Sequence, residues 1–211
     1  MKKINKYCFE HVKDYYEQNI NSYSENHQIL GWESREAQHI RFSVLVDNVD
    51  LYKRSLLDVG CGLGDLFFYL CSQGVELEQY YGVDISEVVV NKALEMNPHL
   101  NIEHRDIFSD QDFVQNNSYD VVYASGIYNL KQNNNINFLE ESLSIYKKVS
   151  KEYVVFNLLS EKSEDKEDAY YYYSSNCITE LVRKFKFAEF SIIEDYLHND
   201  FTVICKVNNE S

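Results

Sequence analysis

The sequence is poor in basic residues. It contains 20 Lys and Arg against 34 Asp and Glu in 211 residues, a formal net charge of −14, and its isoelectric point is about 4.8. A protein that binds nucleic acid needs a basic face to neutralise phosphates. Short basic pairs such as Lys147-Lys148 are typical of solvated helix faces. DNA and bulk RNA are therefore not expected partners.

Long apolar runs and paired cysteines are also missing. The N-terminus has lysines but no apolar segment of a secretory leader, and no run reaches membrane-spanning length. The five cysteines are odd in number and form no C-x-x-C pair, which argues against a disulfide framework and a zinc site. These absences predict a cytoplasmic protein with no membrane partner and no bound metal.

The remaining pattern predicts one α/β domain behind an N-terminal helical extension. Residues 5–19 carry apolar side chains at helical spacing, residues 19–32 are polar and typical of turns, and Ser34 is placed to cap a second helix. Further helices are expected near 63–73, 86–96, 136–149 and 175–186. Strands are expected near 55–60, 79–84, 101–105, 119–125, 152–158, 188–197 and 201–207.

The most informative stretch is an apolar run followed by the alternate glycines Gly60, Gly62 and Gly64. A second apolar run ends on Asp84, about twenty residues later, which is the layout of a nucleoside-binding α/β unit. Glycines let the backbone turn sharply and approach a ligand closely. The Asp84 carboxylate, at the end of its strand, can accept both hydroxyls of a ribose.

The spacing separates two classes of cofactor. A dinucleotide fingerprint requires G-x-G-x-x-G, because a pyrophosphate sits on the helix N-terminus. Here Asp58 precedes the glycines and Asp65 opens the helix, where a carboxylate would repel a pyrophosphate. A ligand that carries an ammonium and a sulfonium fits this acidic turn better, which favours S-adenosylmethionine (SAM).

The same residues resemble a known family. The run Asp58-Val59-Gly60-Cys61-Gly62-Leu63-Gly64 resembles the first motif of class I SAM-dependent methyltransferases, and Asp84 resembles their ribose-binding acid. His104-Arg105-Asp106-Ile107 resembles the later motif whose Asp meets the adenine amino group. The run 119–126 resembles the fourth strand, which passes beneath the methionine part of the cofactor.

The resemblance implies a doubly wound, mostly parallel sheet of seven strands in the order 3-2-1-4-5-7-6, with only the last strand antiparallel. Residues 1–50 would then form a helical cap or lid, and residues 51–211 a Rossmann-like domain. The carboxyl end of the penultimate strand, residues 195–199, would lie on the ligand-binding edge.

The implied cofactor is SAM, with S-adenosylhomocysteine (SAH) as product. The guanidinium of Arg41 is expected to bind the cofactor carboxylate with two parallel hydrogen bonds; the alternative is that Arg41 faces solvent. Ile85 and Ile107 are placed to sandwich adenine, with core packing as the alternative, and a space-filling role is favoured over a reactive thiol for Cys61. The expected cofactor-binding residues are Arg41, Asp58, Gly60, Cys61, Gly62, Asp84, Ile85, Asp106, Ile107, Ser125 and Gly126.

The expected catalytic residues are His198, Asp195 and Tyr128. Tyr128 follows the fourth strand and should face the methyl group. His198 could accept a proton from a hydroxyl or an amine with Asp195 orienting it, although a surface turn is the alternative.

The predicted activity is methyl transfer from SAM to an oxygen or nitrogen of a small molecule, by in-line displacement. Three alternatives stay open. They are a protein or peptide methyltransferase, an RNA methyltransferase, and a SAM-binding module without catalysis.

Overall fold

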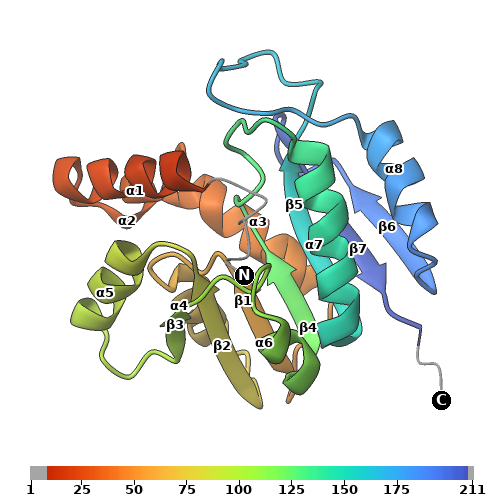
Figure 1. The fold of residues 1–211 in the computed structure, drawn as a ribbon, viewed down its shortest axis with the longest axis horizontal. Helices are drawn as coiled ribbons and strands as arrows, with labels where there is room; N and C mark the ends of the chain where they lie inside the picture. The colour runs from red at the N-terminus through yellow and green to blue at the C-terminus, as the bar shows by residue number, and fades with distance from the viewer. Residues whose placement is uncertain (1–8, 209–211) are drawn as a thin grey trace, which may run out of the picture.

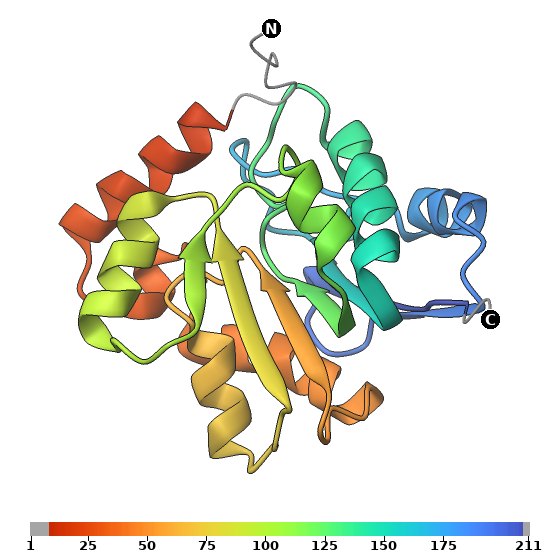
Figure 2. The same ribbon diagram turned by 60° about the horizontal axis from the view of Figure 1, so that its bottom comes forward.

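The computed structural model describes residues 9–208, which form a seven-stranded sheet with helices on both faces (Figures 1 and 2). The strands are β1 (Ser55–Val59), β2 (Gln79–Asp84), β3 (Ile102–His104), β4 (Tyr119–Ala124), β5 (Ser150–Leu159), β6 (Glu189–Ile193) and β7 (Asp200–Lys206). Their order is β3-β2-β1-β4-β5-β7-β6, and β7 runs antiparallel to both of its neighbours. The other neighbouring pairs are parallel, so the predicted fold class is confirmed.

The helices divide between the two faces of the sheet. They are α1 (Glu10–Ser22), α2 (Asn26–Ile29), α3 (Arg35–Asn48), α4 (Asp65–Ser72), α5 (Glu87–Met96), α6 (Gln111–Asn116), α7 (Asn135–Val149) and α8 (Ser175–Lys184). Alternate residues of a strand face opposite sides. Accordingly Leu57 belongs to the core with α6, α7 and α8, whereas Leu56 belongs to the core with α3, α4 and α5.

The N-terminal helices are joined to the sheet domain by specific side chains. Ser34 caps α3 as predicted, because its hydroxyl accepts the Ala37 amide at 3.0 Å. Asp65 opens α4, and its carboxylate accepts hydrogen bonds from the side-chain amides of Asn26 at 2.6 Å and Gln38 at 3.0 Å. In both views α1 lies beside α5 (Figures 1 and 2).

Several element boundaries differ from the prediction. The helix expected over 5–19 begins at Glu10, and residues 5–8 lie outside the described part of the chain. The stretch expected to be turns contains α2. Helix α6 was not predicted; it spans six residues, of which only Phe113 is buried, so its pattern is too short to detect. Strand β6 ends at Ile193, because residues 194–199 form the connection to β7.

No helix between residues 9 and 208 is both long enough and apolar enough to cross a membrane.

Candidate functional site

The central strands end at a cavity that we call the inner cavity. Its sheet side is formed by residues at or just after the carboxyl ends of β1, β2, β3 and β4, namely Gly60, Gly62, Asp84, Ile85, Asp106, Ile107, Ser125 and Gly126. Its opposite wall comes from the N-terminal segment and contains Phe9, Val12, Tyr15, Tyr16, Leu30 and Trp32. The cavity therefore gathers eight of the eleven residues predicted to bind the cofactor.

The glycine turn after β1 has a backbone that other residues rarely adopt. Gly60 has φ = 75° and Gly62 has φ = 56°. A Cβ on Gly60 would lie 2.1 Å from Ile127 Cγ2, and one on Gly62 would lie 2.8 Å from Leu30 Cδ2. Because these glycines have no side chain, the side chains of Ile127 and Leu30 contact the main chain of the turn directly. A ligand in the cavity can contact the same main chain equally closely. Within residues 9–208 the Gly60 carbonyl accepts no hydrogen bond, so it is available to a ligand ammonium.

Asp84 ends β2 with its carboxylate held by two main-chain amides. Gly62 N–H donates to Oδ2 at 3.0 Å and Ser86 N–H donates to Oδ1 at 2.9 Å. Burial raises the pKa of Asp84 above its ordinary value, while these amide hydrogen bonds lower it. Each oxygen keeps a lone pair for a further donor, which matches the two hydroxyls of a ribose.

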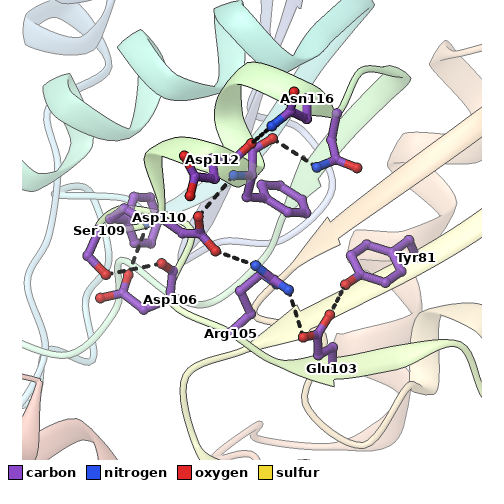
Figure 3. A network of polar contacts seen from close by, with 11 residues as sticks. Tyr81, Glu103, Arg105, Asp106, Ser109, Asp110, Asp112 and Asn116 are labelled. Carbon is purple, nitrogen blue, oxygen red and sulfur yellow. Dashed lines mark hydrogen bonds and ion pairs between the residues drawn. The ribbon is translucent and has the colours of Figure 1, made fainter.

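The loop after β3 is fixed by an ion-pair network centred on Arg105 (Figure 3). Arg105 pairs with Glu103 at 2.8 Å and with Asp110, and Tyr81 donates its hydroxyl to Glu103. The hydrogen bond from Arg105 lowers the pKa of the Glu103 carboxyl. Asp106 lies in this loop, and its Oδ1 accepts the Phe108 amide at 3.0 Å. Its other oxygen has no hydrogen-bond partner in the described chain and can meet an adenine amino group.

Arg41 lines a second, outer cavity and takes part in a buried ion pair. Its Nε and Nη2 both reach Asp200 Oδ2 at 2.8 Å, and its Nη1 donates to the Ala37 carbonyl at 2.8 Å. Asn157 Nδ2 also donates to Asp200, while Asn157 Oδ1 accepts the Gly126 amide at 3.0 Å. Arg41 was predicted to bind the carboxylate of the cofactor, but in this structure its guanidinium binds the carboxylate of Asp200.

The outer cavity adjoins the inner one. The residues that line both are Tyr15, Gly31, Trp32, Asn129 and Tyr170. The Tyr15 and Tyr170 hydroxyls lie 3.4 Å apart and link α1 to the loop that precedes α8. Within residues 9–208, Asn129 Oδ1 is buried and has no hydrogen-bond partner, so an acceptor atom without a donor lies where the cavities meet. The other residues of the outer wall used below are Tyr23, Glu33, Asp165, Glu167, Tyr172 and His198.

Four predicted site residues line neither cavity. Asp58 is buried behind the glycine turn, where it accepts the Tyr80 hydroxyl at 2.7 Å, and burial raises its pKa to about 7. Cys61 is buried, and burial raises the pKa of its thiol, which disfavours the thiolate. Tyr128 is fully buried in the core, with its hydroxyl 3.0 Å from that of Tyr146, instead of facing the methyl group. Asp195 lies exposed within the β6–β7 connection, and only His198 of the predicted pair reaches the outer cavity.

The wall formed by α1 is the main part of the site that the predictions lacked. Burial, followed by the nearby negative charge of Asp84, raises the pKa of the Tyr16 phenol above its ordinary value. From the sequence, Tyr15 and Tyr16 were predicted only to belong to the helix expected over residues 5–19, whose apolar side chains have helical spacing. Helical spacing shows that such residues share a face, but it cannot show which cavity that face covers.

Comparison with known proteins identifies the domain. A family described as a methyltransferase domain matches residues 53–193. No curated protein matches the sequence significantly. The similar solved structures described next are only 14–17% identical to this chain, so they show the shared fold alone.

Three of the similar solved structures are methyltransferases from different organisms. The Synechocystis PCC 6803 magnesium protoporphyrin IX methyltransferase with bound SAH is 15% identical, with a TM-score of 0.60, 95% of this chain covered and 96% of that chain. An Aquifex aeolicus SAM-dependent methyltransferase is 17% identical, with a TM-score of 0.64 and coverages of 88% and 100%. A Haemonchus contortus phosphoethanolamine N-methyltransferase, in complex with phosphomonomethylethanolamine and SAH, is 14% identical, with a TM-score of 0.62 and coverages of 82% and 52%.

Proposed function

The chain belongs to the methyltransferase domain family and is a SAM-dependent methyltransferase; we propose that its acceptor is a small molecule that enters through the outer cavity. The observation that carries the cofactor assignment is Asp84, whose two oxygens are oriented by main-chain amides beside the glycine turn. Asp106, which has one carboxylate oxygen without a hydrogen-bond partner among residues 9–208, supplies the complementary contact for adenine. Structural neighbours that contain SAH support the same assignment.

The enclosure of the inner cavity supports a small acceptor. Side chains of α1 and of the segment around Trp32 cover the cavity opposite the strand ends, and Trp32 lies directly on Gly126. A protein substrate would have to place its reactive side chain beneath this cover while the rest of its folded surface stays outside. A small molecule can enter the cavity as a whole. The net charge of −14 also disfavours RNA as the acceptor.

Bound SAM supplies a methyl group on a sulfonium, so the chemistry needs little from side chains. A lone pair of the acceptor forms the new bond to carbon, and the electrons of the broken C–S bond remain on sulfur. The residues of the two cavities hold the acceptor in line with the methyl group, and orientation of this kind is worth about 7–11 kcal/mol. The acceptor's surplus proton leaves to solvent or to a base.

His198 is our candidate for that base, because it lines the outer cavity on the rim formed by the β6–β7 connection. A positioned base contributes about 10²- to 10⁴-fold in rate. In His198→Ala we expect slower turnover with unchanged affinity for SAH. Normal turnover in this variant would remove His198 from the chemistry.

Calorimetry and a turnover screen test the proposed function. We expect SAM and SAH to bind and NAD not to bind. SAH release is then measured with pools of metabolites, peptides and RNA, and we expect turnover with metabolites. Turnover restricted to peptides or RNA would contradict a small-molecule acceptor. Tight SAM binding without any acceptor would favour a SAM-binding module without catalysis.

A further inference from the structure

The outer cavity has an unusual combination of acidic and aromatic walls. The carboxylates of Glu33, Asp165 and Glu167 line it from two different parts of the chain. Aromatic rings line it as well, and they belong to Tyr15, Tyr23, Trp32, Tyr170 and Tyr172. Carboxylates attract a cation directly, and aromatic faces attract it through the ring quadrupole.

The three carboxylates are not used to hold the protein together. Glu33, Asp165 and Glu167 are exposed, and their side chains form no hydrogen bond or ion pair within residues 9–208. The positions of Asp165 and Glu167 are nevertheless fixed, because the side chain of Tyr172 forms hydrogen bonds with the main chain of both residues. The Tyr172 hydroxyl accepts the Glu167 amide at 2.9 Å and donates to the Asp165 carbonyl at 3.5 Å.

The loop that carries Asp165 and Glu167 is also attached to the residues after β4. Lys131 N–H donates to the Ala169 carbonyl at 2.8 Å, and Tyr171 N–H donates to the Asn129 carbonyl at 2.8 Å. The acidic side chains are therefore free to bind a ligand, although the main chain beneath them is fixed.

The arginine in this wall is already paired within the protein. Three of the five N–H groups of the Arg41 guanidinium donate to Asp200 and to the Ala37 carbonyl. Its charge is balanced by Asp200 at 2.8 Å, and its guanidinium stacks on the Trp32 ring at 4.8 Å from the centroid. Among the residues that line the outer cavity, a ligand carboxylate or phosphate would thus meet three acids without an ion-pair partner and one arginine already paired with Asp200. Lys166 does not line the cavity, and its ammonium lies 5.8 Å from the centre of the Tyr172 ring.

The boundary between the cavities offers a hydrogen-bond acceptor to the same ligand. Asn129 Oδ1 is buried and has no hydrogen-bond partner in the described part of the chain, and Asn129 lines both cavities. Leaving a buried acceptor without a donor is costly. A ligand that spans the boundary and carries an N–H group removes that cost.

We propose that the outer cavity binds a small organic cation of the amine class as the methyl acceptor, with its ammonium held by Asp165, Glu167 and the aromatic wall. Because an ammonium has no lone pair, the atom that is methylated is a different one, a neutral nitrogen or oxygen of the same molecule that extends into the inner cavity and loses its surplus proton to solvent or to His198. This inference rests on the proposed function, because it takes the inner cavity to be the SAM site. It specifies the charge of the acceptor, which the cofactor site alone does not.

Three small ligands of similar shape and different charge test the proposal. They are cyclohexylmethylamine, cyclohexylmethanol and cyclohexanecarboxylate, each titrated into the protein saturated with SAH. Trp32 is the sole tryptophan and lines both cavities, so its fluorescence reports on ligand binding there. We expect the amine to bind about tenfold more tightly than the alcohol, and the carboxylate to bind most weakly.

Two variants test whether the preference for the amine comes from Asp165 and Glu167. In the double variant Asp165→Asn/Glu167→Gln we expect the preference for the amine over the alcohol to fall to about twofold or less. Glu164→Gln is the matched control, because Glu164 is an exposed acid of the same loop that does not line the cavity. The control should keep the full preference, and added salt should weaken amine binding in it as in the unmodified protein.

Several results would overturn the proposal. They are equal binding of all three ligands, preference for the carboxylate, no detectable binding of the amine, and an amine preference that survives in the double variant. Each of these presupposes that SAH binds first. A protein that does not bind SAH would instead contradict the proposed function.

Discussion

The inner and outer cavities adjoin, but they are built from different parts of the chain. The sheet side of the inner cavity consists of main-chain turns and strand-end residues, with Asp84 held by amides at 2.9 and 3.0 Å. The outer cavity consists of side chains from the N-terminal segment, the loop before α8 and the β6–β7 connection. On the function proposed above, main-chain turns at the strand ends bind the cofactor, whereas the side chains of the outer loops select the acceptor.

The buried pair of Arg41 and Asp200 connects the outer cavity to the sheet, and breaking it should have the largest effect on stability. Arg41→Met leaves Asp200 buried without its counter-charge, which costs about 3–5 kcal/mol of the free energy of unfolding. Urea denaturation measures the loss. The double variant Arg41→Met/Asp200→Asn should recover most of it, since no uncompensated charge remains.

Arg35→Met is the control for this prediction, because Arg35 and its partner Glu25 are both exposed. It should change the free energy of unfolding by no more than about 0.5 kcal/mol. If Arg41→Met were equally mild, the outer cavity would not depend on this pair.

Asp58 and Asp84 both belong to the recognised motifs, but only Asp84 lines the inner cavity. The folded protein keeps the Asp58 proton up to a pKa of about 7, whereas an unfolded chain releases it near pH 4. Asp58 therefore lowers the free energy of unfolding as pH rises, by roughly 2 kcal/mol between pH 5 and 7. In Asp58→Asn that fall should disappear, while affinity for SAH is retained.

Urea denaturation at pH 5, 6 and 7 compares the two proteins. The same slope of stability against pH in both would show that Asp58 does not titrate in this range. A large loss of SAH affinity would instead place Asp58 in the cofactor site.

Glycine at position 62 should matter for the ligand beyond its effect on the backbone. Gly62 and Gly74 both have positive φ, 56° and 70°, so Ala at either position costs about 1–2 kcal/mol of stability. Only at Gly62 would the new Cβ meet a neighbour, Leu30 Cδ2 at 2.8 Å, while nothing lies within 4 Å at Gly74. We expect Gly62→Ala to lower SAH affinity about tenfold and Gly74→Ala to leave it unchanged. Equal affinities would remove the glycine turn from the binding surface.

The contrast between the cavities also explains what the sequence could predict. The strand order was implied by the family resemblance that the short motifs carry, whereas the Ser34 cap and the grouping of Gly60 with Asp84 follow from local spacing. The partner of Arg41 does not, because Asp200 is 159 positions away and no local pattern links the two residues. Tyr128 was misplaced for a related reason, since proximity to a strand end does not determine whether a side chain turns toward the ligand or into the core.

Calorimetric titration of SAH into the wild-type protein and Asp84→Ala tests the central claim most directly. Glu87→Ala serves as a control, because Glu87 is an exposed acid close to Asp84 in sequence. We predict that Asp84→Ala loses measurable SAH binding while it keeps its circular dichroism spectrum and cooperative unfolding, and that Glu87→Ala binds as the wild type does. Unchanged SAH affinity in a folded Asp84→Ala protein would contradict the claim that this carboxylate holds the cofactor ribose.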